Sequence, residues 1–306
     1  MTSKEANSPA CGHTDPDGLG GEAGIHPQEG HLIFDGEPIS IKEPEELEED
    51  INVIAGKGEF IGGGVTGLVE RLKSGDAIKS PWTGRSTESD CRQDMMIEAQ
   101  IYKRLGAHPR LVQLKHWDPV DHTLTMEYMP HGNLKEYVKK HRQEISLAQR
   151  QQWAMEAAEG VELLHSHGVV QSDVGPHNFL LDADLSLKIC DFGGSSVDGS
   201  LATVIPGVRY RLPNLTGRKV EPATIKEDLF GLGSTIYFIA TGDEPHSKLT
   251  DDDEVEKLYK DGVFPELGGV PFADVIAPCW RQEAGSAKRI IELVKSSSAQ
   301  IIPDIQ

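Results

Sequence analysis

Polar and apolar positions alternate along the chain from Ile51 onward, which is the pattern of β-strands with one buried face. Leu68–Lys73 and Ala77–Lys79 both follow this alternation, and a Ser-Gly pair between them predicts a turn. Cys91–Leu105 instead repeats apolar side chains at steps of three and four, which predicts a helix. Leu111–Leu114 begins the next strand. The first part of the folded region is therefore predicted to be a β-sheet with one helix.

Helical periodicity dominates the second part of the chain. Ser146–His167 reads as a long buried helix, Asp228–Ala240 as an apolar helix closed by a Thr-Gly pair, and Ser286–Lys295 as a terminal helix. Two short strand-like runs, Val169–Val170 and Leu187–Ile189, are each followed by an aspartate. A strand-rich part followed by a helical part predicts an α+β fold.

The first 50 residues differ in composition from the rest. Residues 1–30 are rich in Gly, Pro, Asp and Glu, and we expect them to be disordered because they cannot bury enough apolar surface to offset ordering entropy. Leu32–Phe34 and Ile39–Ile41 predict a short hairpin through an Asp-Gly turn. The acidic run over residues 43–50 reads as a solvated face or linker. We therefore predict a disordered acidic segment over residues 1–50 and a folded domain over residues 51–300.

The charge distribution bears on the partners. The 306 residues carry a formal net charge of −19, and residues 1–50 hold 13 acidic and 2 basic side chains of that total. The remainder is only mildly acidic, so we expect neither nucleic acid nor an anionic membrane as a partner. The longest apolar run, near residues 232–240, is too short to insert into a bilayer. The oligomeric state stays open.

Cysteine and histidine usage indicates an intracellular, cytoplasmic protein without a metal cluster. The four cysteines lie far apart, with neither disulfide nor zinc spacing. The first five residues lead into no apolar stretch, so we expect no secretory signal. His165 and His167, at the end of the long helix, read as capping or surface residues.

Three oxygen-bearing side chains follow the two strand-like runs. Asp173 precedes Asn178 by five residues, and Asp191 stands directly before a Phe-Gly pair. Strand and loop ends would deliver these side chains toward one place. Divalent cations prefer such oxygen ligands, and a substrate hydroxyl needs such a proton acceptor.

A glycine-rich stretch precedes a lysine and a glutamate of interest. Ile61–Val69 fits the pattern G-x-G-x-x-G-x-V, which dinucleotide-binding folds nearly share, but a strand and not a helix follows it here. Lys79 lies on the next strand, either as a phosphate contact or as a surface lysine. Glu98 falls on the apolar stripe of the predicted helix, so it needs a cationic partner, for which Lys79 is the candidate, unless it sits at a solvated edge.

Taken together, these motifs resemble those of eukaryotic protein kinases over about residues 55–295. The Asp-Val-Gly-Pro-His-Asn stretch and Cys279-Trp280 further resemble a divergent group of fungal kinase-like proteins. The resemblance implies a two-lobed kinase fold, with a β-rich N-lobe over residues 51–126, a hinge over residues 127–132 and a mainly helical C-lobe over residues 133–300.

The same resemblance implies ATP and Mg²⁺ as cofactors, and roles for individual residues. Asp173 would accept the proton of the substrate hydroxyl, Lys79 paired with Glu98 would hold the α- and β-phosphates, and Asn178 with Asp191 would bind the metal ions. Asp228 would hold the backbone of the catalytic loop. The residues expected to contact ATP are Ile61, Gly62, Gly64, Gly67, Val69, Ala77, Lys79, Met126, Glu127, Met129, Leu180 and Asp191.

Several positions depart from the kinase pattern. Ser172 replaces the usual arginine, so a phosphate on Ser195, Ser196 or Thr203 would lack its basic partner. Gly175 replaces a lysine near the γ-phosphate, and His177 is only a partial, pH-dependent substitute for the arginine of tyrosine kinases. Gln171 and Asn214 replace a packing histidine and an anchoring glutamate. These departures predict slow turnover that does not require activation-loop phosphorylation.

Three functions compete on this reading. The first is a protein kinase that phosphorylates a hydroxyl of a protein substrate, serine or threonine in preference to tyrosine. The second is a pseudokinase, an ATP-binding interaction module without turnover. The third is a small-molecule phosphotransferase, which shares the aspartate–asparagine spacing but is not expected to combine the glycine loop, the hinge and the Asp228 helix.

Overall fold

The structure, a computed structural model, describes residues 33–34, 37–38, 56–213 and 222–301, and the chain divides into two units, Met1–Ile51 and Asn52–Gln306. In the first unit, β1 (Ile33–Phe34) pairs antiparallel with β2 (Glu37–Pro38), so the predicted hairpin is present with an earlier second strand. The disorder predicted for residues 1–30 and the linker predicted for residues 43–50 lie outside the described residues.

The second unit begins with an antiparallel sheet of five strands, in the order β3-β4-β5-β7-β6. The strands are β3 (Glu59–Gly63), β4 (Gly67–Arg71), β5 (Ala77–Pro81), β6 (Leu114–Asp118) and β7 (Thr123–Met126). The strands predicted over Leu68–Lys73 and Ala77–Lys79 are thus confirmed, whereas the strand predicted to begin at Leu111 begins at Leu114. The central strand β5 is buried at every position, so a polar side chain on it requires a partner.

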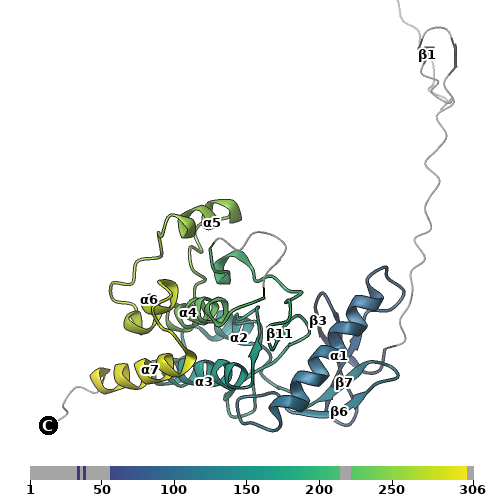
Figure 1. Ribbon diagram of the computed structural model, residues 1–306, viewed down its shortest axis with the longest axis horizontal. Coiled ribbons are helices and arrows are strands. Elements are labelled where there is room, and N and C mark those ends of the chain that lie inside the picture. Colours follow the sequence, from purple (N-terminus) through teal and green to yellow (C-terminus); the bar gives the residue numbers. More distant parts are fainter. Residues whose placement is uncertain (1–32, 35–36, 39–55, 214–221, 302–306) are drawn as a thin grey trace, which may run out of the picture. The chain divides into compact units, whose positions relative to one another are not determined.

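Helix α1 (Glu88–Leu105) packs against this sheet and begins three residues before the predicted start (Figure 1). The stripe of three- and four-residue steps is its buried face, which includes Met95, Tyr102 and Leu105. The helix ends at Gly106, whose φ of 67° is strained for any other residue.

The remainder of this unit is mainly helical, as expected. Helix α3 is its centre: Figure 1 shows α7 alongside it, and α4 also packs on it. The helices described there are α2 (Leu134–His141), α3 (Leu147–Ser166), α4 (Ile225–Thr241), α5 (Asp252–Lys260), α6 (Ala273–Trp280) and α7 (Ala287–Ile301). None of the helices in the described ranges is both long and apolar enough to span a bilayer.

Two short strand pairs carry the polar loops. β9 (Phe179–Leu181) pairs with β10 (Leu187–Ile189), and β8 (Val169–Val170) pairs with β11 (Ser196–Val197). These pairings bring the loop after β8 and the loop after β10 together. The predicted α+β fold, a β-sheet lobe followed by a helical lobe, is confirmed.

Candidate active site

The ammonium group of Lys79 links the sheet, α1 and the loop after β10. Its Nζ atom lies 2.6 Å from Oε2 of Glu98 and 2.7 Å from Oδ1 of Asp191. The side chains of Lys79 and Glu98 are only 7% and 1% exposed, whereas that of Asp191 is 48% exposed. The structure therefore brings together three residues that lie up to 112 positions apart in the sequence. Asp191 is the member of this cluster that is open to solvent.

The electrostatics of this cluster follow from two carboxylates sharing one ammonium group. Burial disfavours the charge on Lys79, but the carboxylates of Asp191 and Glu98 outweigh it and raise its pKa. Partial desolvation opposes the charge on Asp191, yet Lys79 lowers the pKa of that carboxyl. Burial raises the pKa of Glu98, and the attraction of Lys79 offsets only part of this effect. The cluster therefore presents a charged lysine and an ionised, exposed Asp191.

The residue after Asp191 points the other way. Asp191 has a left-handed backbone, with φ of 65°, and the ring of Phe192 is fully buried. That ring packs edge-on against Tyr102 of α1, with 5.1 Å between the ring centroids. The turn thus anchors the loop in the core through Phe192 and leaves the carboxylate of Asp191 toward Lys79.

The catalytic-loop candidates Asp173 and Asn178 are in direct contact. The side-chain amide Nδ2 of Asn178 donates to the backbone oxygen of Asp173 at 2.9 Å and to its Oδ2 at 3.0 Å. The backbone N–H of Cys190 donates to the carbonyl of Asn178, which joins this loop to the segment that carries Asp191. No hydrogen bond in the described part of the chain uses Oδ1 of Asn178, so that oxygen is available to a ligand.

Asp228 of α4 holds the backbone of this loop. Its carboxylate accepts the N–H groups of Gln171 and Ser172 at 2.9 and 2.8 Å, and Ser172 has a left-handed φ of 65°. The predicted role of Asp228 is thereby confirmed. Nε2 of His165 lies 2.9 Å from the same carboxylate, and its side chain is only 8% exposed. The prediction that His165 is a capping or surface residue was wrong, because a helix end packed on Asp228 buries the imidazole.

Gln171 stands where the kinase pattern has a histidine, and it makes hydrogen bonds of its own. Its side-chain NH₂ group donates to the backbone oxygen of Cys190 at 2.9 Å and to that of Asp191 at 3.4 Å. The backbone carbonyl of Gln171 accepts the hydroxyl of Ser195. An amide side chain thus ties the catalytic loop to the Asp-Phe-Gly turn. The other replaced position, Asn214, lies outside the described residues.

Gly175 and His177 are complementary in shape. Nε2 of His177 lies 3.0 Å from Oδ2 of Asp173. A Cβ atom on Gly175 would lie only 2.6 Å from Cε1 of the His177 ring, so a larger residue would displace the ring. Gly175 therefore stands where a lysine was expected, and its lack of a side chain leaves space for the ring of His177, which contacts Asp173.

The glycine-rich turn between β3 and β4 has two kinds of glycine. A Cβ on Gly67 would lie 2.0 Å from the backbone oxygen of Ser80, so Gly67 is required by the close approach of two strands. Gly62 and Gly64 face open space, with no atom within 4 Å of an added Cβ. Backbone at those two positions is accessible to a ligand.

The connection after β7 leaves two backbone groups unused. Met126 is buried at the end of β7, and the carbonyl of Met129 accepts the N–H of Gly132. Within the described ranges, no hydrogen bond uses the carbonyl of Glu127 or the N–H of Met129. One acceptor and one donor, two residues apart, therefore remain for a planar ligand such as adenine.

Residues 55–295 match the family model described as protein kinase domain. The chain belongs to the protein kinase family. The match covers both the β-sheet lobe and most of the helical lobe.

Two curated protein kinases are similar to this chain at low identity. The chain is 26% identical over 218 residues to the Serine/threonine/tyrosine-protein kinase HT1 of Arabidopsis thaliana, which covers 67% of this chain and 54% of the relative. It is 28% identical over 285 residues to the Tyrosine-protein kinase SPK-1 of Girardia tigrina, covering 87% and 56%. The chain spans about half the length of these relatives.

The kinase domain also contains contacts that the sequence pattern did not indicate. Lys188 on β10 forms an ion pair with the Glu127 side chain at 2.8 Å, so the carboxylate of Glu127 is engaged within the domain. Arg104 at the end of α1 forms an ion pair with Asp198, which follows β11. A basic residue in the last helical turn is a weak sequence signal for such a contact.

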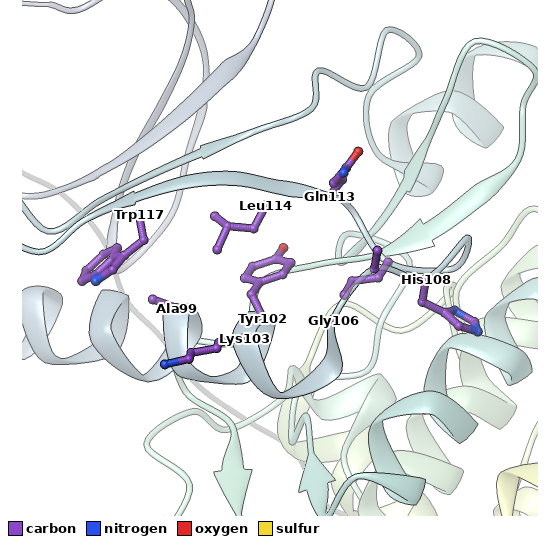
Figure 2. Close-up of a pocket in the computed structure, with 10 residues that line it drawn as sticks. Ala99, Tyr102, Lys103, Gly106, His108, Gln113, Leu114 and Trp117 are labelled. Atoms are coloured by element: carbon purple, nitrogen blue, oxygen red, sulfur yellow. The ribbon is translucent and has the colours of Figure 1, made fainter.

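A separate cavity of about 410 Å³ lies beside the end of α1 (Figure 2). None of the predicted site residues lines it. Its wall includes Tyr102, whose buried hydroxyl has no hydrogen-bond partner in the described part of the chain. Because the Tyr102 ring also packs on Phe192, this cavity borders the kinase site without being part of it. The lining residues are Ala99, Tyr102, Lys103, Gly106, Ala107, His108, Leu111, Gln113, Leu114 and Trp117.

Proposed function

We propose that this domain is an ATP- and Mg²⁺-dependent protein kinase that phosphorylates a hydroxyl of a protein substrate, serine or threonine in preference to tyrosine. The observation that carries the proposal is the contact of Lys79 with both Glu98 and Asp191 while Phe192 is buried. A kinase needs both the lysine–glutamate pair and the aspartate in place to turn over. We also propose residues 51–300 as the domain boundaries.

The donor set fits the cofactors. The exposed carboxylate of Asp191 and the free Oδ1 of Asn178 are hard oxygen donors suited to Mg²⁺. The Mg²⁺–ATP complex would supply the phosphoryl group and neutralise its charge. Lys79 would hold its phosphates, the backbone at Gly62 and Gly64 would lie against them, and the unused groups of Glu127 and Met129 would bind the adenine edge. The side chains expected around the base are Ile61, Val69, Ala77, Met126 and Leu180.

Asp173 is proposed as the proton acceptor for the substrate hydroxyl. Its side chain is 22% exposed, so an incoming hydroxyl can reach it, and Asn178 and His177 both orient its Oδ2 atom. A positioned carboxylate of this kind contributes to general-base catalysis by receiving the proton as the hydroxyl attacks.

We propose turnover without activation-loop phosphorylation. Ser195 and Ser196 are only 3% and 1% exposed, so neither is accessible to a modifying enzyme. The segment is held instead by the Arg104–Asp198 ion pair and by the β8–β11 pairing, neither of which involves a phosphate. Ser172 leaves the usual arginine out of this loop.

The test is transfer of labelled γ-phosphate to a generic protein substrate, with Asp173→Asn and Lys79→Met beside the wild type. We expect transfer by the wild type and a loss of about 10²–10³ in each variant, the effect of removing a positioned catalytic group. Transfer that persists unchanged in Asp173→Asn would overturn the assignment. Phosphoamino-acid analysis of the product decides between serine or threonine and tyrosine.

A second candidate, a pseudokinase, is favoured by one observation. The ring of His177 already contacts the carboxylate of Asp173, and Gly175 has no side chain that could contact the γ-phosphate of ATP. A rise in melting temperature with Mg²⁺–ATP, together with no transfer in a proteome-wide substrate screen, would support this reading over an active kinase.

A further inference from the structure

An acidic side chain of α1 contacts the segment that follows the Asp-Phe-Gly turn, here called the activation segment (residues 193–207). The hydroxyl of Thr203 donates to Oδ1 of Asp94 at 3.4 Å. Gly193 packs at the same place, because a Cβ added to it would lie 3.1 Å from the Cβ of Asp94. The segment is thus seated on α1 through a neutral hydroxyl and a carboxylate.

The surroundings of this contact are negative. Asp90, one turn earlier on α1, and Asp191 both act on Asp94 and favour its neutral form. Burial is the largest cause of the rise of the pKa of Asp94 to about 6. Lys79 is the cation that acts on it, and its ammonium is already shared by Glu98 and Asp191. The carboxylate of Asp94 is thus ionised at neutral pH, and within the described residues no basic side chain forms an ion pair with it.

Thr203 is accessible, in contrast with the neighbouring serines. It is exposed, whereas Ser195 and Ser196 are buried and donate their hydroxyls to backbone oxygens of Gln171 and Ser200. Its backbone N–H donates to the carbonyl of Gly194 at 3.0 Å, which folds the segment back on itself. Of the three hydroxyls considered from the sequence, Thr203 is the one that a second kinase can reach.

A phosphate on Thr203 would change the sign of this contact. It would carry about −1.5 to −2 charges at neutral pH. At a distance of a few ångström from Asp94, two like charges repel, and within the described residues Thr203 has no contact with an arginine or lysine side chain. Modification here therefore favours release of the activation segment from α1.

We propose that Thr203 is a phosphorylation site at which the modification lowers activity by repulsion from Asp94. The inference rests on the proposed kinase function. In the modifying step, Oγ1 of Thr203 attacks the γ-phosphorus of ATP, the bond to the β–γ bridging oxygen breaks, ADP leaves and the hydroxyl proton passes to the base of the modifying kinase. The regulation is thus opposite to that of a kinase whose activation segment is ordered by a phosphate.

The first experiment compares Thr203→Glu with Thr203→Gln, which have the same size and differ by one charge. We expect Thr203→Glu to transfer labelled phosphate about two- to fivefold more slowly than Thr203→Gln, the size that a half-exposed charge pair supports. Adding Asp94→Asn to Thr203→Glu is expected to restore the rate of Thr203→Gln. Equal rates for Thr203→Glu and Thr203→Gln, or no recovery with Asp94→Asn, would overturn the proposal.

A second readout does not depend on catalysis. Amide hydrogen exchange over residues 193–204 is expected to be faster in Thr203→Glu than in Thr203→Gln, and in protein carrying a genetically encoded phosphothreonine at this position than after phosphatase treatment. If the wild type transfers no phosphate at all, the proposed function fails, and the exchange rates still decide the effect of charge at Thr203. Unchanged exchange in both charged forms would contradict the release of the segment.

Discussion

The lysine cluster and the catalytic loop form two sides of one site, and they are held together differently. Around Lys79 the interactions are ion pairs between side chains, two of which are nearly inaccessible to solvent. Around Asp173 the loop is held by its backbone, through the carboxylate of Asp228.

This difference explains where the chain departs from other kinases. A backbone contact does not depend on which side chain the residue carries, so Gln171 and Ser172 can replace a histidine and an arginine while both N–H groups still reach Asp228. A buried ammonium group, by contrast, is stable only while each of its partners keeps its charge. We therefore infer that the lysine cluster tolerates fewer substitutions than the loop.

The largest effect is expected from removing the carboxylate of Asp228, which holds the backbone of the loop. Asp228→Ala should lower the free energy of unfolding by about 3–5 kcal/mol, because it leaves the N–H groups of Gln171 and Ser172 and the ring of His165 unpaired in the interior. Urea denaturation measures it. Gln171→Ala serves as the control, since it removes a side chain but keeps the N–H group. Equal losses in the two variants would show that the loop does not depend on the contacts of Asp228 with its backbone.

The next test addresses the lysine cluster. Glu98→Gln should lower the rate of phosphate transfer about a hundredfold, as for other positioned charged groups, because the ammonium of Lys79 loses one of its two carboxylates. The melting temperature of the same sample separates this effect from unfolding. A rate within threefold of the wild type would show that Asp191 alone positions the lysine.

Gly175→Ala should have a smaller effect. The added Cβ meets the His177 ring at 2.6 Å, so the ring must leave Asp173, and we expect the rate to change by about tenfold at most, as for one positioning hydrogen bond. Single-turnover kinetics measure it. In a background of His177→Ala the same Gly175→Ala change should have no further effect, and an additive loss would indicate that the two residues act independently.

The smallest effect concerns stability and pH. Burial raises the pKa of Asp94 to about 6, so between its unfolded value and pH 6 the folded state binds more protons than the unfolded state. The contribution of Asp94 to the free energy of unfolding therefore decreases as the pH rises from its unfolded pKa to about 6. Asp94→Asn should melt at a higher temperature than the wild type at pH 8 and at nearly the same temperature at pH 4. The opposite order at pH 8 would show that the hydroxyl of Thr203 outweighs burial.

Short-range pattern predicted much of the site. The strand carrying Lys79 and the helix carrying Glu98 follow from alternation and from three- and four-residue steps, and both are present. Because a buried glutamate needs a cationic partner, the sequence also predicted the pairing of Lys79 with Glu98, which the structure shows. By contrast, His165 was misassigned, since periodicity shows only that a residue ends a helix, and the position of Asp228 decides whether that end is buried.

The sequence by itself determined the α+β class, the order of the elements and the residue types at the site, because periodicity, turn residues and motif spacing are local properties of the chain. Only the tertiary structure decided four contacts that no local pattern predicts: Lys188 with Glu127, Arg104 with Asp198, His177 with the space left by Gly175, and Thr203 with Asp94. The reason is physical. An ion pair or a close contact between distant segments depends on distances of a few ångström that only the packing of the whole domain sets.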